Sequence, residues 1–364
     1  RHVQLFTHIY QLKLIPPTSK EVGYRTWHIG KWHLGDDEKY WPENQGFDVN
    51  IAGNYKGAPI KNKQGCNGYF SPYCLPRLEN GKEGEYLTDR LTDEAVHLIE
   101  THGDSPFYLN LAHYAVHTPL GAKPELEKKY EALADSSYFQ HNATYAAMIQ
   151  SVDESLAKLL AALERKGILD NTLIIVTSDN GAVHRISGSY PLRKGKGSEY
   201  EGGVRVPLIT YWKGHILPNQ RNSTPVITMD LFSTVLDVAC VELKDEKVDG
   251  ISLLPVIKGE DLKVRPLFWH YPHYHNGGAR PYSSVRLDEW KLIKQYETHT
   301  YELYNLKEDI GEKEDLSKKN PDKVNELRGI LEKWLKNVDA QLPFANANWN
   351  SEKERKTGKY AGVD

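Results

Sequence analysis

Residues 173–181 read Leu-Ile-Ile-Val-Thr-Ser-Asp-Asn-Gly, and residues 192–207 read Leu-Arg-Lys-Gly-Lys-Gly-Ser-Glu-Tyr-Glu-Gly-Gly-Val-Arg-Val-Pro. The apolar, β-branched run at 173–176 predicts a strand buried on both faces of a parallel sheet. Such sheets place their sites at the carboxyl ends of their strands, which is where Asp179 and Asn180 follow. Two neighbouring oxygen donors suit a hard cation such as calcium, although a plain surface turn is the alternative.

The second of these segments places Lys196 between Gly195 and Gly197. Glycine allows the backbone to approach a ligand closely, and a lysine in such a loop suits an oxyanion. The alternative interpretation is a solvated basic run on the surface. Because the metal turn and the glycine-flanked lysine occur together, a binding site is the better hypothesis.

Two further segments place polar side chains just after predicted strands. Residues 23–35 read Gly-Tyr-Arg-Thr-Trp-His-Ile-Gly-Lys-Trp-His-Leu-Gly, with a short strand expected at 26–29. Lys31 and His33 then share one face of an extended segment. A strand at 106–113 is followed by Ala-Val-His-Thr-Pro-Leu, which puts His117 at its carboxyl end. A capping lysine and surface histidines are the alternative.

Taken in order, these segments resemble the type I sulfatases of the alkaline phosphatase superfamily, from about residue 23 to residue 321. The resemblance implies an α/β fold like that of alkaline phosphatase. Its mixed, mostly parallel sheet would be flanked by helices. A small carboxyl-terminal subdomain of antiparallel sheet and helix would follow. We therefore expect a catalytic domain at residues 1–265 and an α+β subdomain with a polar tail at 266–364.

The same resemblance implies a role for each candidate residue. Lys31 would bind a sulfate oxygen, and His33 would help the covalent intermediate to collapse. His117 would bind sulfate or protonate the leaving oxygen. Lys196 would stabilise the charge of the transition state. The turn at residues 178–181 would supply Asp179 and Asn180 to a Ca²⁺ ion.

The family's nucleophile is a formylglycine made from Cys or Ser in Cys/Ser-Xaa-Pro-Ser-Arg, and this motif is missing here. The Cys74 segment is one residue too short, and the Ser189 segment has Leu192 where the motif has serine. The family's amino-terminal Asp-Asp metal pair is also missing, and we interpret Asp36 and Asp37 as an exposed turn. We therefore expect a truncated start and an inactive chain, with a non-catalytic homologue as the alternative.

Further histidines could contact a substrate. His270, His273 and His275 lie in His-Tyr-Pro-His-Tyr-His, which lacks the Cys or acidic partners of a typical zinc site. We expect a substrate-facing loop there, and a structural aromatic cluster is the alternative. His184 and Arg185 directly follow the metal turn and are close enough to contact substrate.

Periodicity predicts the remaining scaffold. Apolar residues at helical spacing indicate helices at 88–102 and 144–166. Strands are expected at 267–271, 282–286, 290–296 and 301–304, followed by a helix at 323–336. The first twenty residues have no clear pattern, and the polar tail from Pro343 should be loosely ordered.

Composition narrows the class of protein. The 364 residues are 39% hydrophobic and 26% charged, as in ordinary globular proteins. The net charge of −3 gives no reason to expect nucleic acid as a partner. No apolar run is long enough to span a membrane. Cys66 and Cys74 form a local disulfide or remain free thiols, and the oligomeric state is not determined.

The leading hypothesis is a hydrolase of sulfated saccharides, exported as the resemblance implies. A non-catalytic protein that binds sulfated glycans is one alternative. A phosphatase or phosphodiesterase of the same superfamily is another, although the Gly-Lys-Trp-His and Gly-Lys-Gly motifs favour sulfate. The sequence identifies neither the sugar of the substrate nor the carbon atom that carries the sulfate group.

Overall fold

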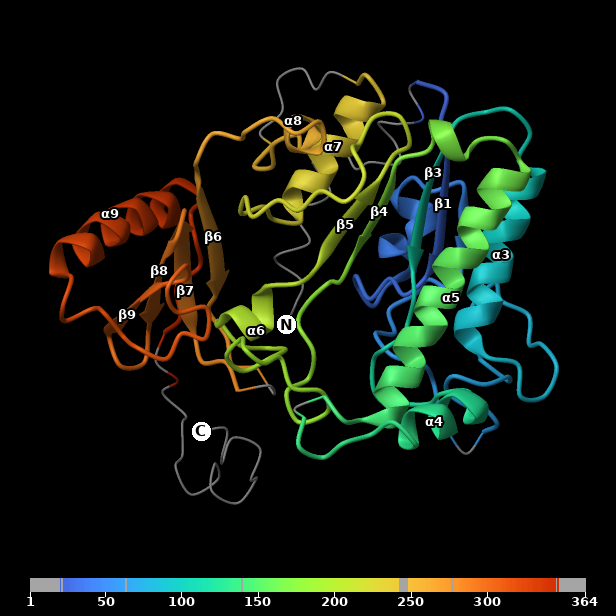
Figure 1. Cartoon of the computed structure of the whole chain (residues 1–364), viewed down its shortest axis with the longest axis horizontal. Helices are drawn as coiled ribbons and strands as arrows, with labels where there is room; N and C mark the ends of the chain where they lie inside the picture. The colour runs from blue at the N-terminus through green and yellow to red at the C-terminus, as the bar shows by residue number, and fades with distance from the viewer. Residues whose placement is uncertain are drawn as a thin grey trace.

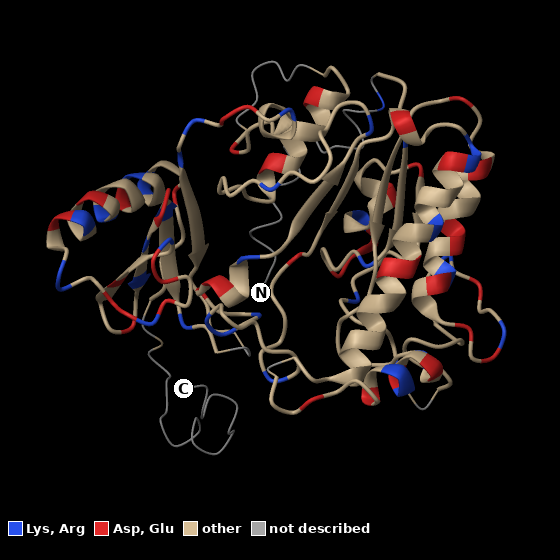
Figure 2. Ribbon diagram, in the orientation of Figure 1, with Lys and Arg blue, Asp and Glu red and all other residues tan. Residues whose placement is uncertain are grey.

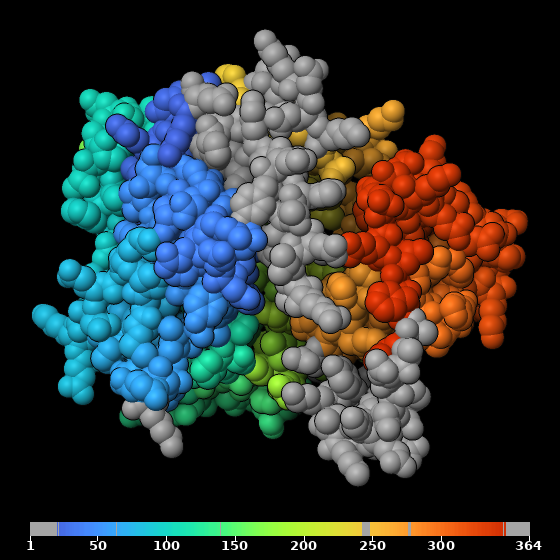
Figure 3. Space-filling model, turned by 180° about the vertical axis from the view of Figure 1, so that it is seen from behind, coloured from blue at the N-terminus to red at the C-terminus, as the bar shows by residue number. Residues whose placement is uncertain are grey.

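The computed structural model describes residues 20, 22–62, 64–138, 140–241, 248–275, 278–344 and 346. Our expectations for the first twenty residues and for most of the tail beyond Pro343 therefore lie outside the described residues. A parallel sheet covered by helices forms one side of the molecule, and an antiparallel sheet with one helix forms the other (Figure 1). Seen from behind, these parts are the blue and the orange-red regions of Figure 3.

Three parallel strands form the first sheet, in the order β2-β1-β3. They are β1 (Arg25–Gly30), β2 (Val49–Ile51) and β3 (Phe107–Ala112). β1 is buried along almost its whole length because both of its edges are paired. The ring of Trp27 in β1 stacks on Phe107 with centroids 4.8 Å apart. This sheet confirms the predicted α/β class.

Two long helices, α3 (Leu87–Thr101) and α5 (Ala143–Arg165), pack against each other beside this sheet (Figure 1). Their buried residues include Leu91 and Met148, as the apolar spacing predicted. Thr92 of α3 donates a hydrogen bond of 2.6 Å to Ser155 of α5. Helix α4 (Pro124–Glu131) packs against α5. Figure 2 shows charges of both signs spread over the outer surfaces of α3, α5 and α9.

The strand before the metal turn differs from our expectation. β4 (Ile174–Thr177) pairs antiparallel with β5 (Leu208–Tyr211), and its residues are half-buried or exposed. Among the described residues β5 is its only strand partner, so β4 is not enclosed by a parallel sheet. Ile174 still packs against the core cluster that contains Trp27. The prediction of a strand was correct, but that of a parallel neighbour with burial on both faces was wrong.

The carboxyl-terminal sheet is antiparallel, in the order β6-β7-β8-β9. Helix α9 (Pro321–Asn337) packs its leucines against one face, and its Trp334 stacks on Phe268 with ring centroids 4.5 Å apart. All four predicted strands and the predicted helix are confirmed. The division into domains at residue 265 stays a prediction. The strands are β6 (Pro266–Tyr271), β7 (Tyr282–Leu287), β8 (Trp290–Gln295) and β9 (Thr300–Asn305).

Shorter elements connect these parts. Cys66 and Cys74 form a disulfide with Cα atoms 5.6 Å apart, so of the two alternatives, a disulfide or free thiols, the structure has the disulfide.

No helix among the described residues has the length and apolarity needed to cross a membrane. The remaining elements are η1 (Glu38–Tyr40), η2 (Pro42–Gln45), η3 (Leu169–Asn171), α6 (Glu201–Val204), α7 (Met229–Val238) and α8 (Leu254–Ile257).

A buried ion cluster joins the carboxyl-terminal sheet to the segment that contains Lys196. The Nζ atom of Lys291 in β8 lies 2.9 Å from Glu201 Oε1 and 2.9 Å from Glu312 Oε1. The backbone N–H of Glu201 also donates to Glu312 Oε2 over 2.7 Å. The side chains of all three residues are almost fully buried. Burial opposes ionisation of Glu201, but the charge and hydrogen bond of Lys291, together with the charges of Arg286 and Arg205, outweigh it and lower the pKa of Glu201.

We expect Lys291→Met to lower the free energy of unfolding by about 3–5 kcal/mol, because it leaves the buried carboxylate of Glu312 without its cation and leaves Glu201 only its longer contacts of 3.5 Å to Arg205 and Arg286. Lys294→Met, on the same strand but half-exposed, is the matched control and should change stability by less than about 1 kcal/mol. Urea unfolding followed by circular dichroism measures both. Equal stability of the two variants would show that the cluster does not hold the fold.

His28 predicts how stability depends on pH. Burial lowers its pKa to about 4 in the folded chain, and its ring is fully buried beside Asn110 and Gly30. The unfolded chain binds a proton below about pH 6.5, whereas the folded chain does so only below about 4. The contribution of His28 to the free energy of unfolding is therefore fully present above about pH 6.5. It falls as the pH is lowered towards 4, by up to about 1.4 kcal/mol per pH unit.

Urea unfolding between pH 7.5 and 4.5 tests this dependence. His28→Gln should reduce the slope even if it lowers stability throughout, and the part due to His113, whose pKa burial also lowers to about 4, should remain. His97→Gln, at an exposed position of α3, should leave the slope unchanged. The interpretation fails if His28→Gln keeps the full slope.

Candidate functional site

Lys31 is positioned by the close approach of β1 to β3. A Cβ atom on Gly30, whose φ is 102°, would lie 2.1 Å from the backbone oxygen of Ala112. Only glycine leaves room there, so the chain turns at once and the N–H of Lys31 donates to that oxygen over 2.7 Å. The ammonium group of Lys31 lies 3.4 Å from Asp179 Oδ2. This contact joins the end of β1 to the turn after β4.

His33 follows in the same loop with a left-handed backbone, at φ 60°. Its N–H donates to the oxygen of Asn54 over 2.9 Å. A Cβ atom on Gly57 would lie 2.4 Å from the His33 ring, so the ring packs directly over that glycine. Loss of hydration lowers the pKa of His33, and the charges of Lys31, His117 and Lys196 lower it further. The residue is therefore close to the other candidates.

His117 is held by hydrogen bonds to its backbone and ring. The hydroxyl of Tyr69 donates to the oxygens of Tyr114, over 2.7 Å, and His117, over 2.8 Å. The Nδ1 atom of His117 lies 2.6 Å from the oxygen of Thr118 and donates to it, which leaves Nε2 as the acceptor of the neutral ring. Burial lowers the pKa of His117, and the charge of Lys196 lowers it further. A bound anion would favour its protonated form.

Lys196 is held by the glycines on either side of it. A Cβ atom on Gly195 would lie 2.3 Å from the oxygen of Ala182, and one on Gly197 would lie 2.0 Å from the ring of His275. The N–H of Lys196 donates to Ala182 over 2.7 Å. Burial lowers the pKa of Lys196, and so does the charge of Lys31, which opposes a second positive charge nearby.

The turn after β4 presents Asp179 and Asn180. The hydroxyl of Ser178 donates to the oxygen of Asn180 over 2.9 Å, and the amide group of Asn180 donates to Gly181 over 3.0 Å. Gly181 packs against Gly202, whose oxygen would lie 1.8 Å from an added Cβ atom. This contact places the turn beside the segment that carries Lys196.

The predicted calcium ion would need more donor atoms than this turn offers. Calcium takes about six to eight oxygen ligands. The carboxylate of Asp179 and the amide oxygen of Asn180 supply two donors, and no group of three or more His, Cys, Asp or Glu that could hold a metal occurs among the described residues. These residues do not form a calcium site by themselves. Calcium binding at this turn therefore stays a prediction.

Taken together, the structure brings the main candidates into one place. Lys31 and His33 follow β1, His117 follows β3, and Asp179 follows β4. Lys196 acts electrostatically on both histidines. We expected these strand ends to belong to one sheet, and that was wrong for β4, which lies in a separate pair. The residues still meet because glycines let the loops between the sheets approach closely.

The three histidines of the 270–275 segment are not equivalent. Both ring nitrogens of His270 are engaged, Nδ1 with Ser283 over 2.7 Å and Nε2 with the oxygen of Gln341 over 2.8 Å, which fits the structural alternative. His273 is exposed, and its ring is 5.6 Å from that of Tyr271. Of the three, only His275 lies at the site. Burial lowers its pKa, and the charge of Lys196 lowers it further.

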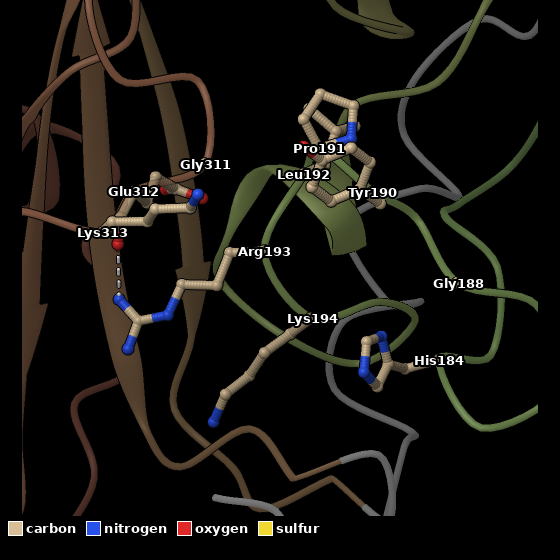
Figure 4. A pocket seen from close by; sticks show the side chains of 10 residues that line it. All are labelled: His184, Gly188, Tyr190, Pro191, Leu192, Arg193, Lys194, Gly311, Glu312 and Lys313. Atoms are coloured by element: carbon tan, nitrogen blue, oxygen red, sulfur yellow. Dashed lines mark hydrogen bonds between the residues drawn. The ribbon is translucent and has the colours of Figure 1, made fainter. Parts of the chain in front are cut away.

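His184 and Arg185 are exposed and lie beside the site. His184 follows the metal turn, and its N–H nitrogen would lie 3.0 Å from a Cβ atom on Gly195. It lines a cavity of about 440 Å³ together with Arg193 and Lys194 (Figure 4). This position is compatible with the predicted contact to substrate.

None of the cysteine and serine residues considered as the nucleophile lies in the expected motif. Cys74 is in the disulfide with Cys66, and Cys240 is exposed on a turn after α7. Ser189 precedes Tyr190 in the wall of the cavity, outside a Cys/Ser-Xaa-Pro-Ser-Arg motif. Sequence reasoning also missed Tyr69 and His28, because their roles arise from contacts across the fold and no local motif marks them.

The pKa values of the histidines show whether Lys196 lies close to them, and no enzyme activity is needed for this measurement. In Lys196→Met the pKa values of His33, His117 and His275 should all rise, because a nearby positive charge is removed. NMR titration of the histidine ring protons measures this. Lys194→Met is the matched control, because Lys194 is not among the charges that shift these three rings. Unchanged values in Lys196→Met would place Lys196 away from the site.

Known proteins share this architecture and these segments. The family described as Sulfatase matches residues 10–241, and the family described as N-sulphoglucosamine sulphohydrolase, C-terminal, matches residues 195–341. A sulfatase of Formosa agariphila is 32% identical, over 87% of this chain and 69% of its own length. The N-acetylgalactosamine-6-sulfatase of Mus musculus is 32% identical, over 71% of this chain and 51% of its own length.

Solved structures agree with these matches. Ps i-CgsB in complex with k-i-k-neocarrahexaose superposes with a TM-score of 0.75 at 30% identity, over 96% of this chain and 79% of the other. The match includes both the helix-covered parallel sheet and the carboxyl-terminal sheet. The chain therefore belongs to the sulfatase family of sulfuric ester hydrolases, within the alkaline phosphatase superfamily.

Proposed function

We propose that the chain binds the sulfate ester of a sulfated carbohydrate at Lys31, His33, His117 and Lys196. The observation that carries the proposal is the convergence of two ammonium groups and two imidazoles on one place, with like charges near enough to lower the pKa of Lys196. An oxyanion relieves this repulsion, so the site is arranged for a negatively charged group. A relative named N-acetylgalactosamine-6-sulfatase, and the complex of Ps i-CgsB with k-i-k-neocarrahexaose, support a saccharide substrate.

The chemistry assigned to each side chain follows from its surroundings. Lys31 and Lys196 stabilise the equatorial oxygens as charge develops on them. With Nδ1 of His117 donating to Thr118, its Nε2 is the atom that would carry a proton to the leaving oxygen. His33 is placed to exchange a proton with the group that attacks sulfur. Asp179 holds the ammonium of Lys31 in position.

The 364 residues contain no formylglycine precursor motif, so we propose that they release no sulfate by themselves. A non-catalytic glycan-binding role is the second candidate, favoured by this missing nucleophile. Calcium binding at Asp179 and Asn180 and export of the protein also remain proposals. The test is sulfate release from an aryl sulfate and from sulfated saccharides. It is run with the 364-residue chain and with any longer gene product that encodes Cys-Xaa-Pro-Ser-Arg in frame.

In a form that carries the nucleophile, Lys196→Ala should lower kcat/KM roughly a hundredfold, equivalent to about 3 kcal/mol of transition-state stabilisation. The fold should be unchanged, as judged by circular dichroism. Lys258→Ala, at an exposed position after α8, is the control and should keep normal turnover. Near-normal sulfate release by Lys196→Ala would contradict the assignment, and release by the 364 residues alone would show that another residue attacks sulfur.

A further inference from the structure

Two cavities lie along the segment that leads from the metal turn to Lys196, and they share part of their walls. The first, of about 440 Å³, lies between residues 184–194 and 311–313. The second, of about 630 Å³, lies between residues 136–138 and 141–143 on one side and residues 184–188 on the other. His184 and Gly188 line both of them. The two cavities are therefore neighbours along residues 184–194, and we call them together the groove.

This groove is fixed beside Lys196. The loop that forms its common wall leaves the metal turn and ends at Lys196, whose N–H is bound to Ala182. Across the second cavity, the side-chain amide of Gln140 donates to the oxygen of Gly188 over 2.7 Å and holds the walls together. At the first cavity, Arg193 donates to the oxygen of Glu312 over 2.9 Å (Figure 4). A ligand in the groove would thus be held close to the sulfate-binding residues.

The charges along the groove favour a polyanion. Arg185, Lys194 and Lys313 contribute positive side chains to its lining. Among the described lining residues the only acid is Glu312, which is buried and paired with Lys291. The whole protein has a net charge of −3, so this local excess of cations is a feature of the groove. This positive charge is more than the binding of a single sulfate group needs.

Two tyrosines add flat apolar surface to the groove. Tyr138 in the second cavity is 66% exposed, and Tyr190 in the first is 59% exposed. A tyrosine ring offers an apolar face and a polar edge, the combination that suits contact with a sugar ring. Both rings flank the segment that contains His184 and Arg185. Each of the two cavities is therefore lined by an exposed tyrosine and by at least one cationic side chain.

We propose that this groove binds several consecutive sugars of a sulfated polysaccharide, so that the chain recognises a segment of polymer and not a single terminal sugar. The inference rests on the proposed function for the position of the reacting sulfate. Tyr138 and Tyr190 contact sugar rings. Arg185, Lys194 and Lys313 pair with sulfate groups that are not hydrolysed.

The test is calorimetric titration of the purified 364-residue chain with disaccharides and hexasaccharides prepared from carrageenan and from chondroitin sulfate. For at least one polymer we expect the hexasaccharide to bind at least about tenfold more tightly than the disaccharide. Tyr138→Ala and Lys313→Ala should each weaken hexasaccharide binding by about threefold to tenfold and leave disaccharide binding unchanged.

Matched controls are Tyr211→Ala, at the far end of β5 from the metal turn, and Arg328→Ala, on the exposed side of α9. Both should bind like the unchanged chain. Equal affinity for the two lengths with both polymers would overturn the proposal. So would an unchanged affinity in both groove variants, or poly-glutamate binding as tight as that of the hexasaccharide.

Lys196→Ala separates this inference from the proposed function. It should weaken both lengths by the same factor, because it acts at the sulfate position alone. If it changes neither, the proposed sulfate site is wrong, while a length dependence that is lost in Tyr138→Ala still supports the groove.

Discussion

The ammonium group of Lys291, enclosed between Glu201 and Glu312, is the contact on which the site depends most. All three side chains are out of water, so Lys291 and Glu312 rely on this cluster for compensation, whereas Glu201 is also 3.5 Å from Arg205 and from Arg286. Glu201 begins α6, directly after the loop that carries Lys196. The carboxyl-terminal sheet therefore determines where this loop lies, although it contributes none of the residues proposed to bind the sulfate.

The start of the same loop is attached to the same sheet. Arg193 donates to the hydroxyl of Tyr304 over 3.0 Å and lies 3.9 Å above the ring of Tyr200. Lys196 is thus held from both sides by contacts to the carboxyl-terminal part of the chain. A rigid loop matters here because a charge stabilises a transition state only if it is already in place.

Crowding of positive charge explains why the site is suited to an anion. The ammonium groups of Lys31 and Lys196 repel each other, and Asp179 compensates only part of this charge. The glycines around Lys196 remove the space in which the loop could relax. The groove along residues 184–194 belongs to the same loop as Lys196, so the proposed polymer binding and the proposed sulfate binding would use one continuous segment of the chain.

The order of local motifs in the sequence was enough to determine the fold class, the long helices, the antiparallel carboxyl-terminal sheet and the identity of the main candidate residues. These features follow from short-range periodicity and from glycines next to charged side chains. The partner of β4, the engagement of His270 with Ser283 and Gln341, and the pairing of Lys291 with Glu201 were decided only by the tertiary structure. Each of them joins residues that no local pattern relates, because strand pairing and charge burial depend on which distant segments the packed fold brings together.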